Sequence, residues 1–157
     1  MAKESGQVRE QRDGQREAGG RREIILESEY NACFGCGQMN PAGLRLAFYE
    51  TDEGVEAEYA IPQQFAGPPG TAHGGIQAAI LDETLCVTAY AKVGTQVVTG
   101  EMTIRYLRPV PTGTPILARG RIVDRKDHSF FIEGAIYLAA TGEELTRARG
   151  RFFAQDP

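Results

Sequence analysis

The run from His73 to Glu83 combines residue types that can do chemistry at two points. At its start, His73-Gly74-Gly75 precedes a helical pattern, and the two glycines would leave the first amide N–H groups of that helix uncovered. The partial positive charge of a helix N-terminus suits an oxygen atom that becomes negative during a reaction, which is how an oxyanion hole is built. His73 would orient a substrate or simply cap the turn. A glycine pair needed only for close packing is the alternative.

Two consecutive acids, Asp82 and Glu83, follow inside the same predicted helix. Their neighbours are apolar: Ala79, Leu81 and Leu85. A carboxylate in such surroundings is unfavourable unless it is partnered or functional. Adjacent helix residues point about 100° apart, so one acid can lie in a site while the other reaches solvent or a partner chain. A solvated or ion-paired acid is the plainer alternative for each.

The cysteines form no disulfide framework, since Cys33, Cys36 and Cys86 are too few and too unevenly placed. Such usage suits a reducing compartment. Cys33-Phe34-Gly35-Cys36 has the spacing of half a zinc site, but the sequence offers no second ligand pair and only two histidines in all. We therefore expect a structural turn here, with no bound metal and no redox activity.

A long helix is predicted over residues 74–92. The stretch has no proline and no glycine after Gly75, and Gly94 is a suitable terminator. Apolar residues occur nearly all round its helical wheel, which is typical of a buried central helix. Before it, residues 61–72 hold three prolines and two glycines, which predicts a stiff, shaped loop.

Strand patterns flank this helix on both sides. Alternating side chains predict a hairpin of strands at 44–48 and 55–59, and further strands at 97–107, 116–123, 130–138 and 145–153. Runs of strands beside a single helix place the chain in the α+β class, as an antiparallel sheet wrapped around one central helix. A sheet with one covered face invites pairing through its outer face or edge, so we expect an oligomer.

Composition indicates one folded domain with a tail. At 157 residues, 41% of them hydrophobic, the chain can bury one ordinary core. Residues 1–22 contain Val8 as their only branched aliphatic, so we expect a disordered tail before a domain at 23–157, with a basic interaction arm as the alternative. A net charge of −4 argues against a nucleic-acid partner. Because the sequence has neither a long apolar run nor a signal-peptide pattern, we expect a cytoplasmic protein without membrane contact.

Three segments carry a family pattern. The first is Gly70-Thr71-Ala72-His73-Gly74-Gly75-Ile76-Gln77-Ala78-Ala79-Ile80-Leu81-Asp82-Glu83. The second is Cys33-Phe34-Gly35-Cys36-Gly37 with Asn40-Pro41-Ala42-Gly43-Leu44, and the third is Thr99-Gly100-Glu101-Met102-Thr103-Ile104-Arg105-Tyr106-Leu107-Arg108-Pro109-Val110-Pro111. Together they resemble the hotdog-fold acyl-CoA thioesterases, particularly the phenylacetyl-CoA thioesterase group. The resemblance covers about residues 31–153 and implies a hotdog fold and hydrolysis of an acyl-CoA thioester.

The resemblance implies a role for each matching position. Asp82 aligns with the acid that serves as nucleophile or general base, and Gly74 with the residue whose backbone N–H polarises the thioester carbonyl. His73 would help to hold that end of the substrate. Thr99 falls where members carry a Ser or Thr that positions water or the carboxylate. Gly67 departs from the family, because some members place an Asn or Gln there, so that polar contact to the substrate is missing or comes from elsewhere.

The implied substrate adds further expected contacts. Gly75 and Glu83, beside the two catalytic positions, are expected to help bind it. Basic residues would meet the CoA phosphates through charge-assisted hydrogen bonds: Arg105, Arg108, Arg125 or Lys126. The acyl group would lie against apolar residues: Phe65, Ile76, Tyr90 and Phe131. A plain surface or core position is the alternative for each, and no cofactor is required.

Helix length separates the two halves of this site. Gly74 and Asp82 are eight residues apart, which is about 12 Å along a helix axis and too far for both to touch one thioester carbon. Two chains related by a two-fold axis, with antiparallel helices, would bring the terminus of one helix near the carboxylate of the other. We therefore expect a homodimer with shared sites, in which Gly74 and His73 come from one subunit and Asp82 and Thr99 from its partner. Dimers of dimers are a further arrangement that the sequence allows.

Two other functions fit the same fold. A non-catalytic acyl-CoA-binding or sensing module is one, because fold alone does not fix function. Such a protein would tend to lack the acid at position 82 and to gain a regulatory domain, for which 22 residues are too few. A hydratase or dehydratase is the other, but its familiar form needs a histidine a few residues after the Asp, and none occurs between His73 and His128.

Overall fold

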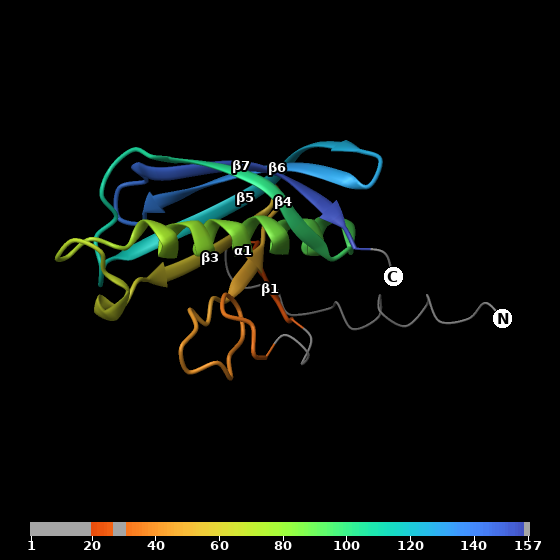
Figure 1. The fold of residues 1–157 in the computed structure, drawn as a ribbon. Coiled ribbons are helices and arrows are strands. Elements are labelled where there is room, and N and C mark those ends of the chain that lie inside the picture. Colours follow the sequence, from red (N-terminus) through yellow and green to blue (C-terminus); the bar gives the residue numbers. More distant parts are fainter. Residues whose placement is uncertain (1–19, 27–30, 156–157) are drawn as a thin grey trace.

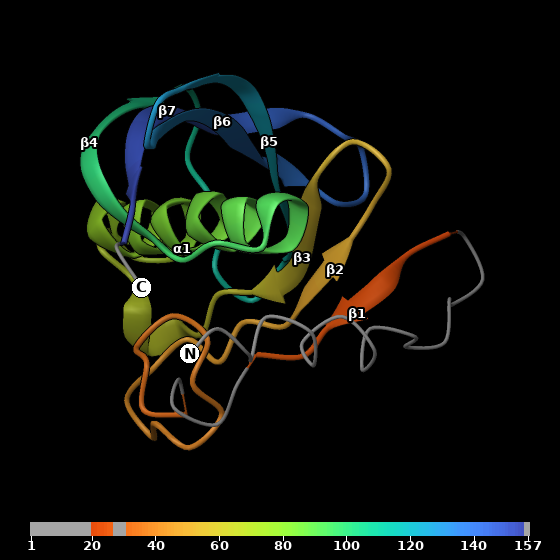
Figure 2. The ribbon, with the colours of Figure 1, turned by 90° about the vertical axis from the view of Figure 1, so that its right-hand side faces the viewer.

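A seven-stranded antiparallel sheet and one long helix make up the computed structural model, which describes residues 20–26 and 31–155 (Figure 1). The elements are β1 (Arg22–Ile24), β2 (Phe48–Glu50), β3 (Val55–Ala60), a 3-10 turn (Gln63–Phe65), α1 (Gly74–Val93), β4 (Val97–Tyr106), β5 (Pro115–Lys126), β6 (Ser129–Leu138) and β7 (Glu144–Ala154). The strand order is β1-β2-β3-β5-β6-β7-β4, so β4 forms one edge of the sheet. Figure 2 shows the sheet curving around α1, which lies across its concave face. The predicted α+β architecture is confirmed.

Helix α1 begins and ends where its sequence indicates. His73 caps its first turn, and Gly94 ends it with a left-handed backbone at φ 75° and an N–H that donates to the Tyr90 carbonyl. Leu81, Leu85 and neighbouring apolar side chains are fully buried against the sheet. The helix is therefore the central, buried element that the apolar wheel predicts, and it fixes the distance between its first turn and Asp82.

A pair of glycines lets the middle of α1 approach the sheet. Gly120 of β5 and Gly134 of β6 are paired across the two strands. A Cβ at Gly134 would lie 2.2 Å from the Arg119 carbonyl oxygen and 2.8 Å from Leu85 Cδ2. A Cβ at Gly120 would lie 2.5 Å from the Thr88 hydroxyl oxygen. Only residues without a side chain fit at these two positions at the observed spacing of helix and sheet.

Replacing Gly134 with alanine should therefore destabilise the fold. The new methyl group meets backbone on one side and a buried leucine on the other, and overpacking of this kind costs about 1–3 kcal/mol. Urea unfolding followed by circular dichroism would measure the change in the free energy of unfolding. An unchanged value would show that helix and sheet lie farther apart than described.

The strand predictions differ from the structure mainly before the helix. Residues 44–48 were predicted as a strand, but β2 begins only at Phe48. Leu44 and Leu46 are buried as their alternation indicates, yet Arg45 between them has φ 54°, a left-handed backbone that cannot join a ladder. The four strands after the helix lie within three residues of their predicted bounds.

The N-terminal boundary also shifts slightly. β1 was not predicted, and it brings Arg22, which we assigned to the tail, into the sheet beside Glu50. Arg21 forms an ion pair with Glu56 of β3. The expectation of a disordered tail otherwise falls on residues 1–19, which lie outside the described residues. Among the elements that are described, no helix is both long enough and apolar enough to cross a membrane.

Candidate active site

One backbone N–H in the first turn of α1 has no partner in the described part of the chain. The Nδ1 atom of His73 accepts a hydrogen bond from the Gly75 N–H at 2.9 Å. The N–H groups of Ile76 and Gln77 both donate to the His73 carbonyl. The Gly74 N–H has no hydrogen-bond partner among the residues that the structure describes. It is thus the helix-terminal donor that remains available to a ligand oxygen.

Four contacts hold this turn in place. Buried Gln77 donates through Nε2 to the Ala72 carbonyl at 3.1 Å and accepts at Oε1 from the Thr146 hydroxyl at 2.6 Å. The His73 N–H donates to the Phe65 carbonyl at 2.9 Å. Phe65, a predicted substrate contact, therefore lies in the loop beside His73. The turn is fixed from the loop, from β7 and from within the helix.

The fourth contact comes from Tyr106, which no sequence pattern marks as a site residue. Its hydroxyl donates to the Gly74 carbonyl at 2.9 Å, across 32 residues of sequence. Its position offers little sequence signal for such a role, because a tyrosine near the end of a strand is common. Tyr106 is 53% exposed, so it lies at the surface beside the Gly74 peptide.

Tyr106 is a positioning residue, and Tyr106→Phe should lower kcat by a few-fold. A net hydrogen bond is worth about 0.5–1.5 kcal/mol, and its loss would loosen the Gly74 peptide without removing the amide donor. Steady-state kinetics would separate the effect, which should fall on kcat with KM nearly unchanged. A rise in KM alone would show that Tyr106 binds substrate instead.

Asp82 lies two turns further along α1. Its Oδ1 accepts a hydrogen bond from the Thr99 hydroxyl of β4 at 2.5 Å. Thr99 directly precedes an irregularity in the pairing of β4 with β7. Asp82 is half-buried and Thr99 is exposed, so the carboxylate is oriented by the threonine while one side stays accessible. The structure thus brings together two of the predicted catalytic residues.

Cys86 adjoins this pair but is poorly suited to be a nucleophile. Its Sγ lies 3.7 Å from the Thr99 hydroxyl oxygen. Burial, followed by the charge of Asp82, raises the pKa of its thiol to about 12. The reactive form of cysteine is the thiolate, which is scarce at neutral pH for such a group.

Glu83 points away from Asp82 toward residues 31–47, the stretch before β2, which is called the N-terminal segment below. Its carboxylate oxygens lie 3.7 and 3.8 Å from Cys33 Sγ. Burial, together with the nearby Glu83 carboxylate, raises the pKa of Cys36 far above its usual range. The structure therefore separates the two adjacent acids, as helix geometry requires, and gives Glu83 cysteine partners that no local sequence pattern indicated.

The predicted basic residues are dispersed. Arg108, after β4, forms an ion pair with Glu143 at 2.7 Å, and its side chain is 65% exposed. Arg105 lines the cavity on the outer face of the sheet, away from α1. Arg125 stacks on Phe130 at 5.1 Å. Phe131, an expected acyl contact, lies beneath Arg151 on that outer face. The structure does not bring Arg105 or Phe131 to the first turn of α1.

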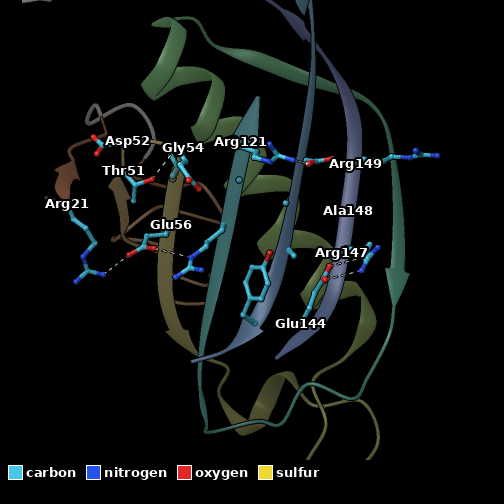
Figure 3. A pocket seen from close by; sticks show the side chains of 18 of the residues that line it. Arg21, Thr51, Asp52, Gly54, Glu56, Arg121, Glu144, Arg147, Ala148 and Arg149 are labelled. Carbon is cyan, nitrogen blue, oxygen red and sulfur yellow. Dashed lines mark hydrogen bonds and ion pairs between the residues drawn. The ribbon is translucent and has the colours of Figure 1, made fainter. Parts of the chain in front are cut away.

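A cavity of about 1120 Å³ lies on the outer face (Figure 3). Its lining is dominated by arginines and acids: Arg21, Arg105, Arg119, Arg121, Arg147, Arg149, Asp52, Glu53, Glu56, Glu133 and Glu144. Several are paired with each other, as in the ion pair of Arg147 with Glu144. Because α1 covers the opposite face, this cavity contains neither the Gly74 amide nor Asp82.

Comparison with known proteins points to one superfamily. Residues 69–144 match the family model of the thioesterase superfamily, a span that includes the first turn of α1, Asp82 and Thr99. None of the curated proteins compared with the chain matches it.

Solved structures share the fold. One, a thioesterase superfamily protein, is 26% identical at a TM-score of 0.68, and the match covers 74% of this chain and 60% of that one, so the chain spans less than two thirds of its length. A Bacillus halodurans protein crystallised with CoA is 29% identical at a TM-score of 0.57, with coverages of 63% and 70%. The PaaI protein from the phenylacetic acid degradation operon of E. coli is 20% identical at a TM-score of 0.63, with coverages of 70% and 83%. The predicted hotdog fold is confirmed by these likenesses.

Proposed function

We propose that the chain is a member of the thioesterase superfamily, whose family model matches residues 69–144, and that it hydrolyses an acyl-CoA thioester to the free acid and CoA. The observation that carries the proposal is the Gly74 N–H, which has no partner among the described residues, at the N-terminus of a helix that also carries Asp82 with its Thr99 partner. The first supplies a donor for an oxyanion, and the second supplies an accessible carboxylate. The Bacillus halodurans structure with CoA, which has a similar fold, supports the choice of thioester.

Each group has a defined part in the reaction. The thioester carbonyl oxygen would accept a hydrogen bond from the Gly74 N–H, which strengthens as that oxygen becomes negative. Asp82, ionised, would either take a proton from the attacking water or attack the carbonyl carbon itself. Collapse of the tetrahedral intermediate breaks the C–S bond and releases the CoA thiolate, which takes up a proton. When water is the nucleophile, this step gives the free acid directly. When Asp82 is the nucleophile, it leaves a mixed anhydride on Asp82, which a water molecule then hydrolyses to the free acid. Thr99 would hold the carboxylate in the orientation that either route needs.

The site is shared between two subunits in this proposal. The continuous helix from Gly74 to Asp82 separates the two groups by about 12 Å within one chain. β4 supports the pairing, because it is a ten-residue edge strand with exposed apolar side chains, including Val98 at 46%. Antiparallel pairing of two β4 strands about a two-fold axis would place the two α1 helices side by side in opposite directions. A dimer of dimers would need a second face, for which the arginine-lined outer face is the candidate.

Substrate contacts follow from the same arrangement. Phe65 and His73 lie together at the first turn and would flank the thioester. Gly75, whose N–H is taken by His73, would contribute backbone surface rather than a second oxyanion donor. Arg108 would meet a CoA phosphate, since its ion pair with Glu143 is exposed and such pairs open at little cost.

A thiol-release assay tests the proposal. The wild-type protein would be offered a panel of aromatic and aliphatic acyl-CoAs, with thiol trapped by a chromogenic disulfide, and calorimetry would measure binding of the same compounds. We expect release of CoA from at least one member of the panel. Tight binding without release across the panel would instead support a non-catalytic acyl-CoA-binding module.

A further inference from the structure

Two cysteines and an acid meet where the N-terminal segment crosses α1. Cys33 and Cys36 come from the turn before β2, and Glu83 comes from the helix 50 residues later. One ligand atom from each, two sulfurs and a carboxylate oxygen, lie within 4.8 Å of one another. Cys36 is buried, and the other two are half-buried. The mechanism proposed above uses none of these three side chains.

We propose that Cys33, Cys36 and Glu83 bind one zinc ion, which fastens the N-terminal segment to α1. Zinc is held by thiolates at about 2.3 Å and by carboxylate oxygens at about 2.0–2.2 Å in a tetrahedral arrangement, so a sulfur and an oxygen ligand lie about 3.6 Å apart. The observed separations of Cys33 Sγ from the Glu83 oxygens are 3.7 and 3.8 Å. Cys33 and Glu83 are therefore close to the spacing that a shared zinc ion requires, and Cys36 Sγ lies within 4.8 Å of the ligand atoms of both.

The backbone of the cysteine turn is closed tightly around this point. The Gly37 N–H donates to the Cys33 carbonyl at 2.9 Å, which folds the chain back directly after Cys36. A Cβ at Gly37 would lie 2.3 Å from the Asn31 carbonyl oxygen and 2.5 Å from that of Cys33. The turn that directs both thiols to one side therefore depends on a residue without a side chain.

Gly35, between the two cysteines, leaves the space that the Glu83 carboxylate occupies. A Cβ at Gly35 would lie 2.6 Å from both Cδ and Oε2 of Glu83. Any side chain there would push the carboxylate away from the thiols. Hydrogen bonds from the Leu44 and Leu46 N–H groups to the carbonyls of Phe34 and Gly35 tie the turn to the chain that leads into β2. The positions of the three side chains are therefore fixed by the backbone of the turn and by the helix.

The ligand set selects the kind of ion. Two thiolates favour zinc over magnesium, calcium or manganese, which prefer oxygen ligands. Both thiols would lose their protons on binding, so two protons are released for each ion. The described residues supply three ligands, and water completes the tetrahedron. The sequence spacing offered only half of a zinc site, and the fold supplies the third ligand from the helix.

Cobalt substitution tests the site without relying on activity. The full-length protein would be reduced with a phosphine, stripped with a chelator and titrated with Co²⁺, whose thiolate charge-transfer absorption reports Co–S bonds. We expect this absorption to saturate at one ion per chain and to be abolished by added Zn²⁺. Absence of the band from the reduced wild-type protein would overturn the proposal.

Three variants and one control assign the ligands. Cys33→Ser and Cys36→Ser should each lose the charge-transfer band. Glu83→Gln should keep the thiolate signal but bind Co²⁺ more weakly. Loss of a residue that only supports a metal ligand weakens binding by roughly 10–100-fold, and loss of the ligand itself should have at least that effect. Cys86→Ser, which changes the remaining cysteine, should bind as the wild type does.

The same variants test which side chains bind the ion. If a cysteine variant fails to fold, the titration of the wild-type protein and that of Glu83→Gln still show whether the ion binds at the proposed site. Unchanged affinity in Glu83→Gln, or loss of the band in Cys86→Ser, would contradict the site as assigned.

Discussion

Gly74→Pro should lower kcat by about 10²–10³-fold, the loss that follows removal of one oxyanion-hole donor. Proline has no N–H, so this substitution deletes the one helix-terminal amide that lacks a partner in the described structure. The effect should fall on kcat, because the bond to the oxygen strengthens only as charge develops in the transition state. Steady-state kinetics on the best acyl-CoA of the panel would measure it.

The fold should accept this change with little strain. Gly74 is the first residue of α1, where proline is favoured in helices. His73 before it has φ −60° and ψ 137°, the extended conformation that a residue preceding proline adopts. A Cβ at position 74 would lie 3.4 Å from the Tyr106 hydroxyl oxygen and 3.5 Å from two carbons of its ring, which is ordinary contact.

Gly74→Ala is the matched control, since it adds a comparable side-chain carbon but keeps the N–H. It should retain most of the activity. Equal losses in the alanine and proline variants would show that space at position 74 matters rather than its amide.

Asp82→Asn should lower kcat by about 10²–10⁴-fold, the usual contribution of a positioned acid or base. The amide has the shape of the carboxylate and can still accept the Thr99 hydrogen bond through its oxygen. It can neither take a proton from water nor form an acyl intermediate. The thiol-release assay would show the loss, with calorimetry showing that substrate binding is retained.

The control for Asp82→Asn is Asp52→Asn, the same chemical change at an exposed acid in the turn between β2 and β3. It should leave the rate as it is. Full activity of Asp82→Asn would remove this carboxylate from the mechanism, and loss of substrate binding would make it a binding residue.

The sequence allowed most of the fold to be predicted, because local patterns decide it. The helix was predictable from the absence of proline and the terminator Gly94, and the later strands from alternation. The early strand at 44–48 was not, because the left-handed backbone of Arg45 depends on its surroundings: its Nε donates to the Asn40 carbonyl. β1 has only three residues and no alternation to read.

The candidate site was predictable only in part, for a related reason. Gly74 and Asp82 lie on one helix, so their spacing follows from the sequence alone. The contact of Tyr106 with Gly74 and that of Glu83 with Cys33 join residues 32 and 50 positions apart, and only the folded sheet brings them together. The spacing of Cys33 and Cys36 by itself predicts a plain turn, because the third ligand of the proposed zinc site comes from the helix.

Mixing Gly74→Pro with Asp82→Asn subunits tests most directly whether the site is shared. Each variant alone is expected to be nearly inactive. In a shared site, a mixed dimer holds one site with both defects and one with neither, because the intact Gly74 and the intact Asp82 come from different chains. About half of randomly exchanged dimers are mixed, so an equimolar mixture should recover about a quarter of the wild-type activity. If subunits exchange, as native mass spectrometry would show, and no activity returns, both groups belong to one chain and the shared site is wrong.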